Sequence, residues 1–260
     1  MEGIVRKTLI AFTAVAAALG MAGAASAAPL VANGGFETNT GTGQLGFNVS
    51  ATGWSVPVPT TSGGSYFFLY NAAGGTTSGT SADNGGANGI LGNVALWGPG
   101  NGSANGLTVS PNGGAFVGAD PDFNNGAISQ TITGLTPGQS YNLDFFFAAS
   151  QQAGFLGATS GGWQVTLGSQ VENTPLLPNV SKGFSGWVPE QLVFTATSGT
   201  ETLSFLATGT GGAALPPFAL LDGVTLTPVP EPATWALMLV GVGALGAGLR
   251  MRRREVFAAA

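Results

Sequence analysis

Short apolar segments separated by turn residues run through residues 31–226, and they restrict the fold of this chain most strongly. Residues 128–132 and 163–167 alternate apolar and polar side chains, a pattern typical of a strand with one covered face. Residues 141–147 are almost continuously apolar, as expected of a strand that is covered on both faces. No part of this region has an apolar period of helical type over a useful length. The region between the two ends of the chain is therefore predicted to be all-β.

Further strands complete a two-layered arrangement. They are predicted at residues 191–196, 202–207 and 218–226, with weaker candidates at 30–37, 53–58, 66–70 and 115–118. A Pro-Gly turn at 134–139 joins two of the stronger strands. About nine or ten strands in a region of roughly 200 residues favour two packed sheets. We predict an all-β fold, a jelly-roll β-sandwich ectodomain over residues 28–227.

Residues 71–114 interrupt this pattern. They include 13 Gly and 7 Asn, and an ordinary connection between strands is much shorter. Three alternatives fit: a flexible insertion, a disordered loop, or short strands of poor propensity. We expect this segment to be the least ordered part of the ectodomain, with packing confined to Ile90, Leu91 and residues 94–97.

The residue types that are missing or scarce exclude several functions. The chain has no Cys, so its core must be stable without disulfides. It has no His, which excludes every Ser-His or Cys-His catalytic arrangement. Residues 28–227 contain one base, Lys182, and nine acids, a net charge of −8. Nucleic-acid binding needs a basic footprint, and none is present.

The first 27 residues have the pattern of a cleavable signal peptide. Arg6 and Lys7 precede an apolar stretch, and Ala25 and Ala27 form a small-residue cleavage site before Ala28. The pattern predicts export by the Sec machinery and removal of residues 1–27 by signal peptidase. The alternative is an uncleaved membrane helix, but the run is short and ends in small residues.

Residues 228–254 carry a second signal. Val229-Pro230-Glu231-Pro232 ends the β region, because proline neither continues a strand nor sits inside a helix. Residues 233–249 are apolar and would span roughly 25 Å as a helix, the short end of what crosses a bilayer. Four arginines follow, at Arg250, Arg252, Arg253 and Arg254. They would hold the tail, residues 255–260, in the cytoplasm and leave the β domain outside. We predict one C-terminal transmembrane helix.

The proline motif, the short apolar helix and the arginine cluster, in this order, resemble the PEP-CTERM sorting signal. The resemblance implies recognition by an exosortase, a membrane-embedded processing enzyme, and removal of the tail. The family occurs in Gram-negative bacteria that make exopolysaccharide. It therefore implies a protein held transiently in the inner membrane and then displayed at the outer surface or in the extracellular matrix. The alternative is a plain single-span anchor with a chance Pro-Glu-Pro sequence.

Four patches of the β region resemble carbohydrate-binding modules of the galactose-binding-like jelly-roll fold. They are Asn33-Gly34-Gly35-Phe36-Glu37, Gly53-Trp54, residues 128–141 and residues 221–226. The resemblance implies that the first and last strands lie close together and hold a structural calcium ion. Glu37 and Asp222 would be its ligands, helped by main-chain carbonyls near Asn33. Calcium prefers oxygen ligands of this kind. Gly223 stands where the family often has a second Asp, and the alternative is that the two acids cap strand ends.

Three functions remain for the ectodomain. A glycan-binding module would expose aromatic side chains, for which Trp97, Tyr66 and Trp187 are the candidates, whereas Trp163 shares a face with Val165 and Leu167 and is expected in the core. A structural or adhesive scaffold would bury its aromatics and have no discrete ligand. A glycoside hydrolase would need two facing carboxylates, and Asp120 and Asp122 are close in sequence but lie in a typical turn. We predict a protein that is not an enzyme and that associates with exopolysaccharide or a biofilm, as a glycan binder or as a scaffold.

Overall fold

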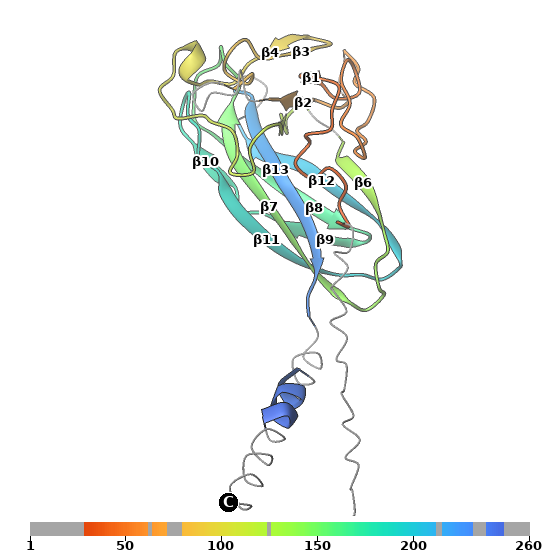
Figure 1. Ribbon diagram of the computed structural model, residues 1–260. Helices are drawn as coiled ribbons and strands as arrows, with labels where there is room; N and C mark the ends of the chain where they lie inside the picture. Colours follow the sequence, from red (N-terminus) through yellow and green to blue (C-terminus); the bar gives the residue numbers. More distant parts are fainter. Residues whose placement is uncertain are drawn as a thin grey trace, which may run out of the picture.

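The computed structural model of this chain describes residues 29–61, 64–71, 80–123, 126–211, 215–230 and 238–246. Several predicted signal residues lie outside the described part: Ala25, Ala27, Ala28, Glu231, Pro232, Arg250, Arg252, Arg253 and Arg254. The described part is a β domain followed by a short helix at 238–246 (Figure 1). Its elements are β1 (Gly43–Gln44), β2 (Phe67–Tyr70), β3 (Ala87–Gly89), β4 (Gly92–Val94), η1 (Pro99–Asn101), β5 (Phe116–Ala119), β6 (Ile128–Thr133), β7 (Ser140–Gln151), β8 (Thr159–Leu167), β9 (Gln170–Asn173), β10 (Leu177–Asn179), β11 (Val188–Thr195), β12 (Thr200–Thr210) and β13 (Pro217–Pro228).

The strand order in the described part is that of a jelly roll. One sheet has the order β1-β2-β5-β13-β7-β11, and the other has the order β10-β8-β12-β6, with β9 paired to β8. Neighbouring strands are antiparallel. From β5 to β8, and again from β10 to β13, each strand lies in the sheet opposite the one before it. The four strands β5-β13-β7-β11 therefore face β6-β12-β8-β10, as in an eight-stranded jelly roll. The predicted all-β jelly-roll sandwich is confirmed.

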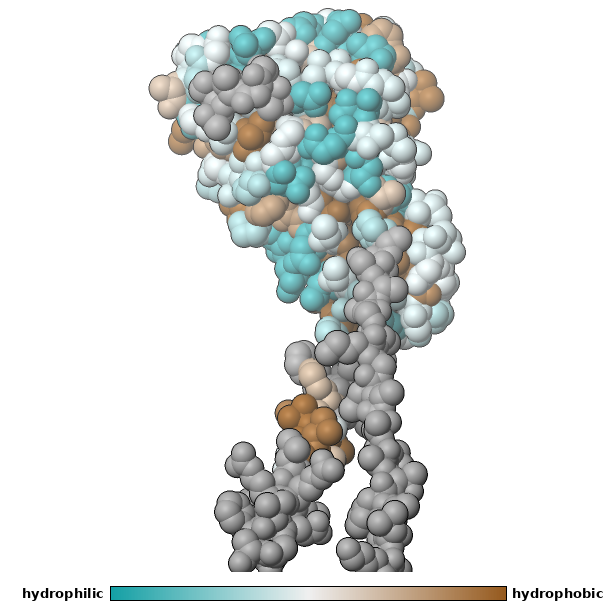
Figure 2. All heavy atoms as spheres, viewed as in Figure 1, coloured by the Kyte–Doolittle hydropathy of each residue, from teal (hydrophilic) through white to brown (hydrophobic). Residues whose placement is uncertain are grey.

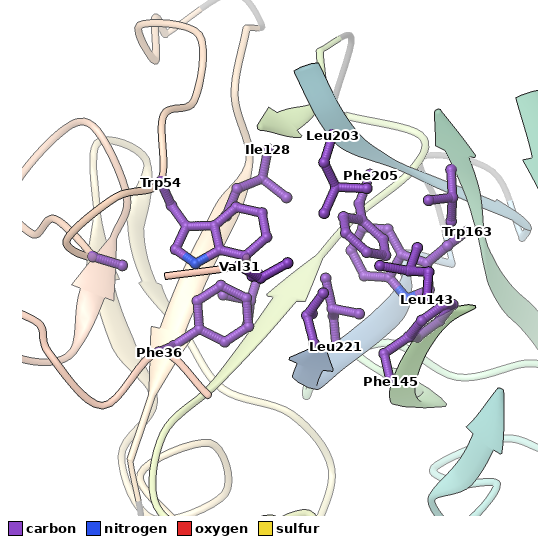
Figure 3. Close-up of a cluster of buried hydrophobic side chains, with 14 of the residues drawn as sticks. Val31, Phe36, Trp54, Ile128, Leu143, Phe145, Trp163, Leu203, Phe205 and Leu221 are labelled. Carbon is purple, nitrogen blue, oxygen red and sulfur yellow. The ribbon is translucent and has the colours of Figure 1, made fainter. Parts of the chain in front are cut away.

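The main core lies between the two sheets and is built around aromatic rings (Figure 3). Trp163 on β8 is fully buried, stacks on Phe67 at 6.4 Å between ring centroids and meets Phe205 edge to face at 6.2 Å. Its indole N–H crosses to the opposite sheet and donates to the Leu220 carbonyl at 3.0 Å. The core position predicted for Trp163 follows from the alternation along β8, which points every second side chain inward.

A second core lies on the outer face of the six-stranded sheet. Phe68, Tyr70, Phe116, Phe218 and Leu220 point away from the main core and are fully buried. Residues of the 80–114 segment cover them, namely Ala82, Ala87, Val94, Leu96 and Leu107. Of the three alternatives for the insertion, short strands of poor propensity describe residues 80–114. These residues bury apolar side chains against the sheet, whereas residues 72–79 of the same segment lie outside the described residues, so the expectation that this segment is the least ordered stays a prediction.

Asp83 holds this covering segment in shape. It is fully buried, and its Oδ1 accepts hydrogen bonds from the main-chain N–H (3.0 Å) and the hydroxyl (3.1 Å) of Thr80. Its Oδ2 accepts the main-chain N–H of Gly100, within η1, at 3.0 Å. One carboxylate therefore joins the two ends of the segment that contains β3 and β4, and compensates for its weak strand propensity.

Two of the weaker strand candidates are wrong. Residues 30–37 form a turn, because Asn33 and Phe36 have positive φ angles of 51° and 59°. Residues 53–58 contribute an isolated bridge from Ser55 to Ser129. The other predicted strands are present with ends shifted by a few residues. Residues 30–37 and 53–58 are thus held by side chains that pack into the main core, such as Phe36 and Trp54, and not by strand pairing.

The helix at 238–246 lies inside the predicted transmembrane segment, 233–249. Its described side chains are apolar and exposed, with Leu239 at 73% and Val240 at 67%, and Figure 2 shows it as a hydrophobic segment beyond the β domain. Among the helices in the described residues, none is long and apolar enough to cross a bilayer.

Candidate functional site

The N-terminal turn places Glu37 beside the start of β5 in the six-stranded sheet. The side-chain oxygen of Asn33 accepts the Thr38 N–H at 2.9 Å, and its amide donates to the Thr38 carbonyl at 3.0 Å. The Asn33 carbonyl accepts the Phe36 N–H at 3.0 Å and the Trp54 indole N–H at 2.9 Å. Phe36 is fully buried, with its ring centroid 5.1 Å from that of Trp54 (Figure 3). Both features fix the turn from which Glu37 projects.

The turn docks on an irregularity in β13. The register between β13 and β7 shifts between Asp222 and Thr225. At this bulge Val224 donates its N–H to the Gly34 carbonyl at 3.0 Å. A Cβ on Gly34 would lie 1.8 Å from the Val224 carbonyl oxygen, so only glycine permits this approach. Gly223 has a φ of 65°, in the left-handed region that favours glycine, so a residue with a side chain would be strained at this bulge.

Asp222 is fully buried where three segments meet. Its Oδ1 accepts the Gly223 N–H at 2.7 Å, and its Oδ2 accepts the hydroxyl of Ser110 from the insertion. Burial raises the pKa of Asp222 to about 7. The hydrogen bonds from Ser110, Gly223 and Asn112 oppose that rise, whereas the negative charge of Glu37 adds to it. A buried carboxylate with a second carboxylate nearby is a site where a cation or a proton is favoured.

The structure brings Glu37 and Asp222 together at this junction. Glu37 is exposed, and its Oε1 accepts the Ala115 N–H at 2.9 Å. The amide of Asn112 and the hydroxyl of Ser110 complete a set of oxygen-bearing groups that suits calcium in kind. Within the described residues, no group of three or more Asp, Glu, His or Cys side chains could hold a metal ion. A calcium ion at this junction would therefore need amide, hydroxyl, main-chain or water oxygens besides the two carboxylates.

The sequence could not supply the partners of Asp222. Ser110 and Asn112 lie 112 and 110 residues from it along the chain, in a segment without a recognisable motif. The carbonyls near Asn33 were expected to assist a calcium ion. In the structure the Asn33 carbonyl accepts two hydrogen bonds and the Gly34 carbonyl accepts one, because the positive φ of Asn33 turns its peptide toward Trp54.

The three aromatic side chains considered for glycan binding differ in exposure. Tyr66 is buried, with its ring centroid 4.7 Å from that of Phe68, and burial raises its pKa to about 12. Trp187 is half-buried, donates its indole N–H to the Thr108 carbonyl at 3.0 Å and packs edge to face on Phe116. These two rings therefore stabilise the second core.

Trp97 lies in a loop cluster at the far end of β7. It is half-buried, and its indole N–H donates to the Phe155 carbonyl at 2.8 Å. The Lys182 ammonium sits 4.5 Å from the centre of the Trp97 ring, a cation–π contact. Neighbouring Leu156 and Val180 are exposed by 59% and 74%. Polar loops with a partly open aromatic ring can offer a saccharide both a stacking face and hydrogen bonds.

Lys182 is held firmly at this place. It has a positive φ of 59°, unusual for a residue with a side chain. Its N–H donates to the Gln151 side chain at 2.8 Å. Its carbonyl accepts the hydroxyl of Ser103 at 2.7 Å and the amide of Asn105 at 2.9 Å. Segments far apart in sequence thus converge on the main chain of Lys182, and they fix the point from which its side chain reaches Trp97.

The acid pair considered for hydrolysis shares one turn. Asp120 is buried, and its Oδ1 accepts the main-chain N–H of Asp122 at 2.9 Å. The pKa of Asp120 is raised to about 7, mainly by burial and in smaller part by the negative charge of Asp122. This is the geometry of an Asx turn at the end of β5.

The domain ends at the start of the C-terminal signal. Val229 follows β13, and its N–H donates to the Ser140 carbonyl at 2.8 Å. The Val229 carbonyl accepts the side-chain amide of Gln139 at 2.6 Å. Pro230 is exposed. β7 begins at Ser140 and reaches the Trp97 loops at Gln151, so the two ends of the domain are about 36 Å apart at 3.3 Å per residue.

The sequence was compared with protein families, curated proteins and solved structures. Residues 228–254 match the PEP-CTERM protein-sorting motif. The comparison with curated proteins finds no match.

Among the solved structures that this chain matches is TmCBM61 in complex with β-1,4-galactotriose, at 14% sequence identity and a TM-score of 0.42, covering 78% of this chain and 99% of that one. Another is the CBM22-1 xylan-binding domain of Paenibacillus barcinonensis Xyn10C, at 13% sequence identity and a TM-score of 0.32, covering 68% of this chain and 94% of that one. A third is the enzymatically active domain of tailspike protein 4 from bacteriophage CBA120, at 12% sequence identity and a TM-score of 0.33, covering 77% of this chain and 21% of that one. At these levels of similarity the fold assignment rests on the strand order, and the ligands of those proteins are not transferred to this chain. The chain is a jelly-roll protein that carries the PEP-CTERM protein-sorting motif at residues 228–254, the mark of an exported protein sorted to the cell surface.

Proposed function

We propose that this chain is a non-catalytic surface or matrix protein of a Gram-negative bacterium that associates with exopolysaccharide. It would leave the cytoplasm through the Sec machinery, lose residues 1–27 to signal peptidase and be held in the inner membrane by residues 233–249. An exosortase would then remove the C-terminal tail. The observation that carries this proposal is the sorting motif, which matches at 228–254 and begins at the last residue of β13.

The separation of the two ends of the domain supports display of the Trp97 loops. The motif is attached at the Val229 end, about 36 Å along β7 from the Trp97 loops. We propose that the loops contact polysaccharide through Trp97, Leu156 and the polar side chains around them. Aromatic rings supply large contact areas at low entropic cost, which suits binding of weakly hydrophobic sugar faces.

The second candidate is a scaffold without a discrete ligand. It is favoured by the packing of Tyr66 and Trp187 into the second core, and by Lys182, which occupies part of one face of Trp97. The Asp120–Asp122 turn supports a non-catalytic role, because its two acids hydrogen bond through the main chain within one turn.

Processing and binding can be tested separately. Cells that make the full chain and the cognate exosortase should yield a surface form that lacks the C-terminal tail, as read by intact-mass spectrometry. Replacing Pro230, Glu231 and Pro232 with Ala should leave the tail attached and the protein in the inner membrane. Normal removal of the tail from that variant would refute the sorting function.

Binding to exopolysaccharide is measured with the processed form and its Trp97→Ala variant. A loss of retention on the purified polysaccharide, with an unchanged melting temperature, supports glycan binding. Trp187→Phe is the matched control, since Trp187 contributes to the second core. Equal retention of both variants and the original protein, or no retention of any, supports the scaffold.

We propose a structural calcium ion at the Glu37–Asp222 junction. A bound cation would offset the repulsion between the two carboxylates, which contributes to the raised pKa of Asp222. Calcium at 1 mM should raise the melting temperature by several degrees over an EDTA sample, and Glu37→Gln should remove most of that shift. An unchanged melting temperature with calcium would show that hydrogen bonds from Ser110, Asn112 and Gly223 are sufficient.

A further inference from the structure

The first residues of the sorting motif, which follow directly on β13, have few main-chain donors. Pro228, Pro230 and Pro232 alternate with Val229 and Glu231, and proline has no N–H. Between residues 228 and 232 only Val229 and Glu231 can donate a main-chain hydrogen bond. Val229 is therefore the last residue before Pro230-Glu231-Pro232 that could bind a partner through both main-chain groups.

Both main-chain groups of Val229 are engaged by the domain. Its N–H donates to Ser140 at 2.8 Å, and its carbonyl accepts the Gln139 amide at 2.6 Å. The same Gln139 amide also donates to the Ser140 carbonyl at 3.0 Å. We call these three residues the strand-end latch. It extends the pairing of β13 with β7, in which Pro228 lies opposite Tyr141 and Thr227 opposite Asn142.

One recurring way in which proteins bind peptides is as extended strands, through the main-chain hydrogen bonds of the peptide. An enzyme that reads the residues before Pro230 would compete with β7 for the groups of Val229. The chain upstream of Pro230 has no free stretch, because β13 is paired up to Pro228 and the latch follows at once.

We propose that residues 227–229 detach from β7 when the exosortase processes this protein, so that the strand-end latch sets the rate of tail removal. The inference rests on the proposed exosortase processing. Gln139 acts here as a positioning residue: its amide binds the main chain of Val229, the residue before Pro230-Glu231-Pro232, and before detachment it does not touch the enzyme. The fold of the domain and the exposure of its sorting motif are thereby linked.

A disulfide can close the latch without altering residues 228–254. Asn142 and Thr227 lie opposite each other in the ladder, on the outer face. Opposed residues of an antiparallel pair have Cα atoms about 4.5–5.5 Å apart, within the range of about 4.4–6.8 Å that a disulfide accepts. The chain has no Cys of its own, so Asn142→Cys with Thr227→Cys forms a single defined bond.

A matched control uses the same first cysteine. Asn142 also lies opposite Val193 of β11, which is exposed by 53%. Asn142→Cys with Val193→Cys therefore ties β7 to its other neighbour and leaves β13 free. Each variant is made as the full chain in cells with the exosortase. Removal of the signal peptide, read by mass, shows that export has occurred.

The β7–β13 disulfide should make the precursor persist at least tenfold longer than the original chain or the β7–β11 control, and a reductant should restore processing. Gln139→Met, which removes both hydrogen bonds that the Gln139 amide makes in the latch, should speed processing by about 2- to 10-fold. Equal processing of both disulfide variants, with Gln139→Met unchanged, would overturn the latch. If the original chain keeps its tail, the exosortase function itself fails, a result distinct from equal processing of all variants.

Discussion

The buried carboxyl of Asp120 should make this domain less stable as the pH rises toward neutrality. Asp120 is 2% exposed at the end of β5, and burial raises its pKa from 3.8 to about 7. Asp122 and Tyr66 are the titratable groups that interact with it. Below pH 3.8 the carboxyl is protonated in the folded and unfolded chain alike. Between 3.8 and about 7 the folded chain holds a proton that the unfolded chain releases, so the stability gained at low pH is lost as the pH rises through this window.

The size of the effect follows from the shift. Each pH unit inside the window costs about 1.4 kcal/mol of unfolding free energy per carboxyl. For a folded pKa of about 7, the loss between pH 5 and pH 8 is about 2.6 kcal/mol. Asp222 has the same raised pKa of about 7 and should contribute a second loss of similar size in the absence of a bound cation. Asp120→Asn should therefore halve the pH dependence, and Asp120→Asn with Asp222→Asn should remove most of it.

Urea unfolding of the purified full chain in mild detergent measures this, with tryptophan fluorescence as the readout from the buried Trp54 and Trp163. The quantity to compare is the difference in unfolding free energy between Asp120→Asn and the original chain, at pH 5 and at pH 8. We expect that difference to move by about 2.6 kcal/mol in favour of the variant at pH 8. A difference that stays constant across this range would refute the assignment of a raised pKa to Asp120.

Three further substitutions test the packing. Asp83→Ala should lower the free energy of unfolding by about 2–3 kcal/mol, because two main-chain N–H groups and a hydroxyl lose a buried acceptor. Hydrogen exchange should rise in residues 80–101 while β7 and β13 stay protected, and an equal rise in all of these segments would contradict this. Gly34→Ala should cost about 2 kcal/mol or more by thermal melting, because its Cβ would meet the Val224 oxygen, whereas Gly199→Ala, with its nearest contact at 3.5 Å, should behave like the original chain. Trp163→Ala should cost about 3–5 kcal/mol by urea unfolding, and a loss below 1 kcal/mol would contradict the central position of this ring.

The sequence predicts the strands of the main sandwich well, because their side-chain patterns report burial directly. The expectation that the run 141–147 is covered on both faces is wrong for most of it: the side chains at 141, 143, 145 and 147 are buried in the main core, whereas Asn142, Asp144 and Phe146 on the opposite face are half-buried. Coverage of both faces begins at Ala148, which lies under the insertion. The alternation at 163–167 places Trp163 inside. These features depend on local periodicity alone.

The covering insertion could not be predicted in the same way. β3 and β4 consist mainly of Gly and Asn, whose strand propensity is low, and they pack because Phe68 and Tyr70 present apolar rings beneath them. Their stability comes from contacts distant in sequence, such as the Gly100 N–H donating to Asp83. No periodic signal within 80–114 reports those partners.

The candidate site was only partly accessible from the sequence. The family resemblance predicts that Glu37 lies near Asp222, and the structure places them at one junction. It does not predict that Ser110 donates to Asp222, or that the Asn33 carbonyl turns toward Trp54. The first contact depends on the path of a long loop, and the second depends on the positive φ of Asn33.

The position of Lys182 has a consequence for the survival of this protein outside the cell. In the proposed processed form, without residues 1–27 and the arginine tail, the chain contains a single basic side chain, so proteases of trypsin-like specificity have one bond to attack, the Lys182–Gly183 peptide. That bond is firmly held, since the Lys182 carbonyl accepts two hydrogen bonds and Gly183 is buried. An extended protease groove could bind it only after the loop cluster opens. Trypsin-like proteases secreted by neighbouring cells would thus meet a surface with almost no accessible cleavage site. For the same reason, shotgun proteomics based on trypsin would under-report this chain in any community sample.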